Sequence, residues 1–124
     1  MQSPLIRESM AFTQFDQAMV EVRVEEFLER RRPPVHLRDK ADLGYRIEGQ
    51  SVILFEIRPV FRRPEEKIKI PVAKTTFVKK NGSWNVLWRR SDQKWHSYEP
   101  VPEADSLDTF LELVDQDEYG CFWG

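Results

Sequence analysis

Four side chains that could bind a phosphate or a nucleic-acid base are expected on one face of a three-stranded sheet: Lys74, Arg89, His96 and Tyr98. The Asn81-Gly82 pair between two apolar runs is a strong hairpin signal, because a type I′ turn needs positive φ at both central residues. A two-residue loop at this pair would place Lys74 opposite Arg89 on one face, and Thr75 opposite Trp88 on the other. A second tight turn, shortly after Arg89, returns the chain and adds His96 and Tyr98 to the face of Lys74.

Cations and aromatic rings on one sheet face are groups that can bind nucleic acid. Lys and Arg neutralise phosphates, and aromatic rings stack on bases. A solvated sheet surface without a partner is the alternative, since antiparallel sheets often expose one face to water. The glycine-aromatic strand motifs of RNA-binding sheets are not present. Our first hypothesis is a non-enzymatic binding module whose partner is phosphate-bearing, as nucleic acid is, or an acidic protein. Its surface would comprise Arg46, Arg58, Lys74, Arg89, Lys94, His96 and Tyr98.

Asp42 and Glu56 raise a second hypothesis, a metal-dependent hydrolase. With Arg58 two residues after Glu56, the pattern is similar to that of metal-dependent nucleases, in which two carboxylates hold Mg²⁺ and a lysine lies near the attacking water. Arg58 departs from that pattern, because an arginine is always protonated and cannot act as a base. A cross-strand ion network of Arg46, Glu56 and Arg58 is the simpler interpretation. The metal site would require Asp42 and Glu56 on one sheet face, about 2 to 2.6 Å from a shared ion.

The other nucleophiles and possible metal ligands form no motif. Neither His36 nor His96 has a second His or Cys at metal-ligand spacing, and no serine lies in a Gly-x-Ser-x-Gly elbow. Cys121 is the only cysteine, which excludes an internal disulfide and favours a reducing compartment. We therefore expect no metal and no cofactor, and a cytoplasmic location.

The composition predicts one globular domain. The chain has 124 residues, of which 40% are apolar, enough to bury a core. Its 19 Lys and Arg nearly balance its 21 Asp and Glu, so a nucleic-acid site would have to be a local patch. No segment has the apolar length of a membrane span or the core of a signal peptide. We expect a loosely ordered lead-in over residues 1–11 and one α+β domain over residues 12–124.

Residues 12–34 predict a helix. Thr13 lies three residues before Asp16 as an N-cap pair, and Pro33 and Pro34 end the segment. The predicted apolar face consists of Phe12, Phe15, Met19 and Val22. Three consecutive arginines, residues 30–32, would complement the negative end of the helix dipole. Alternating valines at residues 20–24 also fit a strand.

Residues 43–47 and 53–57 alternate apolar and polar side chains on either side of a turn at Gly49, which predicts a hairpin. Placing both apolar sets on one face would need an odd connection or a bulge, because a one-residue slip moves one set to the other face. The opposite face would then gather Arg46, Glu56 and Arg58.

Two prolines, Pro59 and Pro64, predict an irregular excursion after this hairpin, since proline cannot donate to a strand ladder. Residues 67–80 follow as a long strand that bends at Pro71.

The C-terminal residues predict a second helix, capped by Asp105 or Ser106 and closed by Gly120. Its buried face would be Leu107, Phe110, Leu111 and Val114. The order of helix, about five antiparallel strands in a meander, and helix predicts an α+β fold with the C-terminal helix on one sheet face.

The final Phe122-Trp123 pair should be buried, since burying each large aromatic is worth roughly 1.5 to 3 kcal/mol. We expect the pair to dock on its own domain. A third hypothesis is a homodimer or complex subunit whose aromatic seam comprises Trp84, Trp95 and this pair.

The motifs RRPP, GYRIEGQSV, EIRP, PVAK, KWHSYEPVP and DEYGCFWG together resemble a family of small bacterial proteins, domain of unknown function 3024. The resemblance runs from about Phe12 to Gly124. It implies a stand-alone bacterial domain and supplies no activity, cofactor or catalytic residue.

Overall fold

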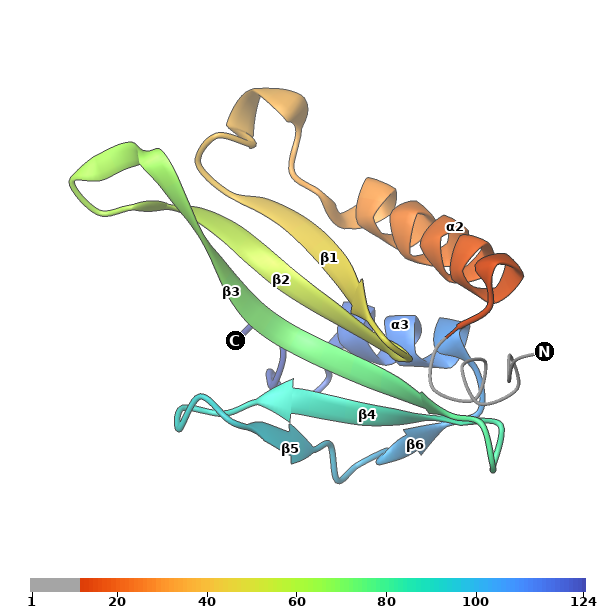
Figure 1. The fold of residues 1–124 in the computed structure, drawn as a ribbon. Coiled ribbons are helices and arrows are strands. Elements are labelled where there is room, and N and C mark those ends of the chain that lie inside the picture. Colours follow the sequence, from red (N-terminus) through yellow and green to blue (C-terminus); the bar gives the residue numbers. More distant parts are fainter. Residues whose placement is uncertain (1–11) are drawn as a thin grey trace.

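The computed structural model describes residues 12–124, so the expected lead-in over residues 1–11 lies outside the described part. Within that part the chain forms two α-helices, one 3₁₀ helix and six strands (Figure 1). In chain order these are α2 (Gln14–Arg31), η1 (Val35–Leu37), β1 (Asp42–Glu48), β2 (Ser51–Val60), β3 (Arg63–Val78), β4 (Ser83–Arg89), β5 (Trp95–Ser97), β6 (Glu103–Ala104) and α3 (Leu107–Gln116).

The strands form one antiparallel sheet in the meander order β1-β2-β3-β4-β5, and the short β6 also pairs with β4. Helix α2 contacts β1 and α3, while α3 contacts β4 and β6. Figure 1 shows the two helices close together beside the twisted sheet. The predicted α+β meander with flanking helices is confirmed, and β6 is an addition. We call the sheet surface that faces away from the helices the outer face.

Helix α2 begins as predicted, with the Asp16 amide donating to the Thr13 hydroxyl at 3.1 Å. The predicted apolar stripe is wrong, because Phe15, Met19 and Val22 are exposed. The buried face is instead Val20, Val24, Phe27 and Leu28. Both stripes have helical spacing, and only the position of the sheet decides which one is covered.

The first hairpin does not place its apolar sets on one face. Glu48 lies opposite Ser51, so the connection has two residues, and Tyr45 pairs with Leu54 while Arg46 pairs with Ile53. Leu54 therefore faces the helices, and Ile53 faces outward. Arg46 is thereby separated from Glu56 and Arg58, and the expected three-residue ion network is wrong.

The predicted irregular excursion is confirmed only in part. β2 and β3 continue through both prolines, with Pro59 opposite Lys67, but a register shift after Pro59 pairs Val60 with Arg63 and leaves residues 64–66 without partners on β2. Pro59 lies beyond the last residue paired with β1, where its missing N–H removes no bond to that strand. The bend at Pro71 is confirmed, since a register shift there leaves Val72 without a partner on β2.

The Asn81-Gly82 turn exists, but its loop spans residues 79–82, and Thr75 pairs with Val86. This register differs by two residues from the predicted one, so Lys74 and Arg89 still share the outer face.

The next turn changes the candidate site. Arg89 pairs with Trp95 and Trp88 with His96, so Trp95 faces outward and His96 faces the helix side. The predicted place of His96 and Tyr98 beside Lys74 is wrong. Arg90 pairs with Lys94, so the turn between them has three residues, 91–93. Because this number is odd, each side chain of β5 lies on the face opposite to the one predicted.

Helix α3 begins at the predicted Ser106 cap, whose hydroxyl accepts from the Thr109 amide at 3.1 Å. Its four predicted core residues are buried. The helix ends at Asp117, in the left-handed region with φ 42°, rather than at Gly120. The tail docks on its own domain, because Phe122 is buried against Tyr98 with ring centroids 4.9 Å apart.

Candidate functional site

The outer face of the sheet carries a cluster of cations and aromatic rings. Strand pairing positions its members: Arg46 on β1, Phe55 on β2, Lys69 and Lys74 on β3, Arg89 on β4 and Trp95 on β5. Arg46, Ile53 and Lys74 lie side by side in one row across three strands. The bulge at Val72 lets Lys69 and Lys74 share this face although an odd number of positions separates them.

Trp95 forms the first half of this cluster. The Lys74 ammonium lies 5.8 Å and the Arg89 guanidinium 5.6 Å from the centroid of the indole ring. Cations within about 6 Å of an aromatic face are attracted by its quadrupole. The ring is half-buried, so part of its surface is open to solvent beside two positive charges.

Phe55 forms the second half. Lys69 Nζ lies 5.1 Å and the Arg46 guanidinium 5.9 Å from its ring centroid. Phe55 and Ile53 are only 4% and 2% exposed, although neither α2 nor α3 covers this side of the sheet. The long stems of the surrounding cations shield them, as snorkelling side chains do. This half is therefore a second small apolar cluster with charged groups at its surface.

The charges of the cluster are largely unneutralised. Arg46 Nε is paired with Glu48 at 2.5 Å. Across residues 12–124, no carboxylate forms an ion pair with Lys69, Lys74 or Arg89. Three cations on one face without an acidic partner can bind an anion.

Three of the predicted site residues, Arg46, Lys74 and Arg89, come together on the outer face. His96 does not join them, because its Nε2 lies 2.8 Å from the Asp92 carboxylate. Tyr98 is buried, and burial raises the pKa of its hydroxyl.

The remaining predicted residues also lie elsewhere. Glu56 accepts from Arg58 Nε at 2.9 Å on the helix side, and Lys94 lies in the turn before β5. The sequence reasoning missed Lys69 and Trp95. The odd length of the turn at residues 91–93 was the signal that would have placed Trp95, and not His96, on the outer face beside Arg89.

Asp42 and Glu56 do not meet the condition for one shared metal ion. Asp42 pairs with Ile57 and Glu56 with Leu43, so strand alternation directs the two carboxylates to opposite faces. Both border a cavity of about 220 Å³ at the edge of β1, but each is held by an arginine. The hydrogen bonds from Arg32 hold the pKa of Asp42 below its ordinary value.

Cys121, His96 and Tyr98 line a different cavity of about 350 Å³. Burial, with a contribution from the charge of Asp117, raises the pKa of the Cys121 thiol above its ordinary value. A thiol with a raised pKa is a poor nucleophile at neutral pH, because the thiolate is the reactive form. This cavity therefore lacks the electrostatics of a nucleophilic site.

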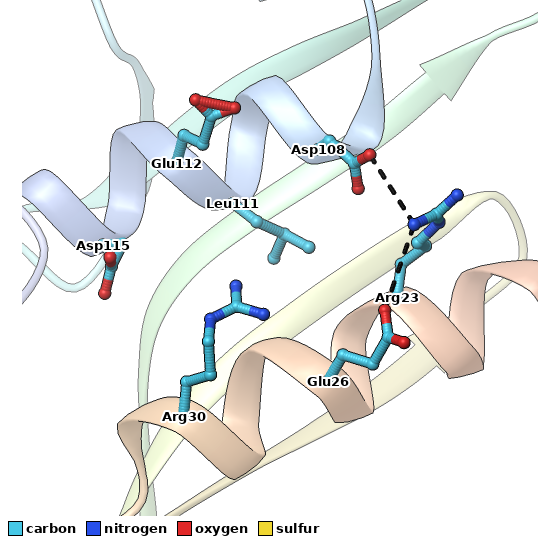
Figure 2. Close-up of a pocket in the computed structure, with 7 residues that line it drawn as sticks. All are labelled: Arg23, Glu26, Arg30, Asp108, Leu111, Glu112 and Asp115. Carbon is cyan, nitrogen blue, oxygen red and sulfur yellow. Dashed lines mark ion pairs between the residues drawn. The ribbon is translucent and has the colours of Figure 1, made fainter.

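The helix side carries charges of the opposite sign. Figure 2 shows a cavity of about 250 Å³ between α2 and α3. It is lined by Arg23, Glu26, Arg30, Asp108, Leu111, Glu112 and Asp115. Arg23 Nη1 lies 4.0 Å from both Glu26 and Asp108, so it bridges the two helices. With four acidic and two basic side chains, the lining of this groove has a net negative charge.

The fold and the cluster define an α+β protein with two helices on one side of an antiparallel sheet and a basic, aromatic surface on the other. A family model described as a domain of unknown function (DUF3024) matches residues 12–124, and the chain belongs to this family. Neither the search of curated proteins nor the search of solved structures found a significant match. None of the helices within residues 12–124 is long and apolar enough to cross a membrane.

Proposed function

We propose that this protein is a binding module whose outer sheet face holds single-stranded nucleic acid. The observation that carries the proposal is the position of two cations beside the half-exposed Trp95 ring, with Lys74 5.8 Å and Arg89 5.6 Å from its centroid. Single-stranded nucleic acids bind where cations follow the backbone and aromatic rings accept stacked bases. A duplex would not offer its base faces to a ring on a sheet.

Within this surface each group has a separate role. Trp95 stacks on one base, while Lys74 and Arg89 neutralise the flanking phosphates. Lys69 extends the positive charge along β3 beyond Phe55. Phe55 is buried beneath its cations, so it supports the surface and does not stack on a base.

The overall charge supports a local site. The net charge is −2, so the chain has no general attraction for polyanions. The acidic groove between α2 and α3 would repel the phosphate backbone, which orients the strand onto the outer face. Binding should therefore be strongest at low ionic strength.

The proposal is tested by the fluorescence anisotropy of a labelled single-stranded oligonucleotide over a range of salt concentrations. Arg89→Ala should weaken binding, and the slope of log K against log salt should fall by about 0.7 for the lost phosphate contact. The control Arg30→Ala removes an exposed arginine from the helix-side groove and should leave binding unchanged. Lys74→Ala and the exposed Lys40→Ala form a matched lysine pair. Equal losses in test and control variants, or no binding at low salt, would contradict the proposal.

A further inference from the structure

Half of β3 is an open strand edge. β4 pairs with β3 only from Ala73 to Val78, whereas β2 pairs with it as far as Arg63. Within residues 12–124, the segment 63–72 of β3 therefore has backbone partners on one side alone. Figure 1 shows this part of β2 and β3 as an arm that reaches beyond the remaining strands.

The arm exposes apolar side chains as well as an edge. Every residue of segment 63–70 is exposed, and Phe61 at the tip is 85% exposed. Ile68 and Ile70, on the helix side of the arm, are 46% and 38% exposed. An isolated two-stranded ribbon is at best marginally stable in water, and an exposed edge is a template for another strand.

We propose that this edge pairs with the same edge of a second copy, in antiparallel orientation about a two-fold axis. The order of charges along the edge supports the choice of partner. The acidic Glu65 and Glu66 are followed by the basic Lys67 and Lys69, and a two-fold axis reverses this order in the partner strand. Glu65 of one copy can then lie against Lys69 of the other, whereas parallel pairing would oppose like charges.

One register brings opposite charges together twice. Pairing Glu65 of one copy with Lys69 of the other does so once in each direction about the two-fold axis. Lys67 then lies at the axis, opposite Lys67 of the second copy, so the two Glu65–Lys69 pairs have to outweigh one pair of like charges. The Lys67 ammonium donates to the Asp39 carbonyl at 2.5 Å within its own chain, which gives it a partner away from the facing lysine.

The two prolines limit this pairing. Pro64 and Pro71 lack a backbone N–H, so the ladder between copies is confined to the residues between them. The net charge of −2 is too small to keep two copies apart. Assembly would make one continuous sheet from two chains and place the two outer faces side by side.

The test is sedimentation equilibrium of the full chain over a concentration series, without nucleic acid, so that its outcome is independent of the proposed function. The wild-type protein should approach twice its 14.8 kDa mass at high concentration. Glu65→Lys and Lys69→Glu should each raise the dimer dissociation constant at least about tenfold, because each creates two like-charge pairs. Circular dichroism checks that both exposed-site variants fold.

Charge exchange makes the test specific. An equimolar mixture of E65K and K69E should dimerise again, because Lys now lies opposite Glu in both pairs. The double variant E65K/K69E should also recover the dimer by itself. A wild-type protein that stays monomeric at every concentration would overturn the proposal. The open edge of β3 would then be a pairing site for a strand of another protein. A dimer that both single variants retain would overturn it too, because another surface would then join the copies.

Discussion

The guanidinium of Arg32 donates two hydrogen bonds to the carboxylate of Asp42, from Nε at 2.8 Å and from Nη2 at 2.7 Å. Arg32 is the residue at which α2 ends, and Asp42 is the first residue of β1. This fork geometry is the strongest form of side-chain ion pair, and the Asp42 side chain is only 13% exposed. The pair therefore fixes the end of the helix to the edge of the sheet across the loop between them.

Asp42→Asn should destabilise the protein by about 1.5 to 3 kcal/mol, because it removes charge-assisted hydrogen bonds from a partly buried site. Urea denaturation at neutral pH measures the change. Glu112→Gln, at an exposed position on α3, is the control and should have little effect. Equal stabilities of D42N and the wild type would contradict a structural role for this pair.

The same carboxylate gives a pH dependence of defined sign. Arg32 lowers the pKa of Asp42 in the folded chain below its ordinary value of 3.8. A depressed pKa contributes stability above the unfolded pKa, and that contribution is lost as the pH falls through the folded pKa. The difference in unfolding free energy between wild type and D42N should therefore shrink when urea titrations are repeated from neutral pH down to below 3.8. A difference that stays constant or grows on acidification would contradict this assignment.

Gly44→Ala should destabilise the protein by about 1 to 3 kcal/mol, the usual cost of overpacking. A Cβ at Gly44 would lie 2.6 Å from Cε1 and 2.9 Å from Cζ of the Phe55 ring. The measurement is a double-mutant cycle with Phe55→Leu, in which the cost of the alanine should fall because the ring is gone. An unchanged cost in the F55L background would show that another contact is responsible.

Asp117→Ala should loosen the C-terminal tail. The Asp117 carboxylate accepts from the Phe122 amide at 3.0 Å and from the Trp123 amide at 2.9 Å. Alanine loses both bonds and is poorly suited to φ 42°, whereas asparagine tolerates that conformation and keeps one acceptor oxygen. Both variants remove the charge that helps to raise the pKa of Cys121, so the informative comparison is between them. The reaction of Cys121 with a thiol reagent should be faster in D117A than in D117N. Equal rates in the two variants would show that Asp117 does not hold the tail through these bonds.

Trp95→Ala should weaken oligonucleotide binding by about 1 to 3 kcal/mol, the value of one stacked base, whereas Trp95→Phe should lose much less. Anisotropy at fixed low salt measures both. If W95A binds as well as the wild type, and polyglutamate competes for the surface, the outer face binds anions in general, as an acidic protein partner would require.

The aromatic seam of the third hypothesis is largely occupied within the chain. Trp84 packs against Phe77 with ring centroids 4.9 Å apart. Trp123 donates to the Val114 carbonyl at 2.8 Å and lies under the Arg31 guanidinium at 4.4 Å. Arg31 also donates to the Asp115 carboxylate at 2.8 Å, so the second of three arginines predicted to complement the helix dipole joins two helices and the tail.

The sequence by itself determined the elements whose signals are local. Thr13 and Ser106 cap their helices because a hydroxyl at that position satisfies an amide in the first turn. The face of α3 followed from apolar spacing, and burial of Phe122 followed from its apolar area. Lys74 and Arg89 were found because alternation survives a register change of two residues.

Only the tertiary structure decided which stripe of α2 is covered, which strands share an apolar face and whether Trp95 or His96 joins Lys74. Each of these three outcomes depends either on whether a loop has one residue more or less, or on an element that is distant in sequence. In a strand, one residue more or less moves every later side chain to the other face. The candidate site is composed of residues from five strands, so its membership follows from those connections and not from the residues alone.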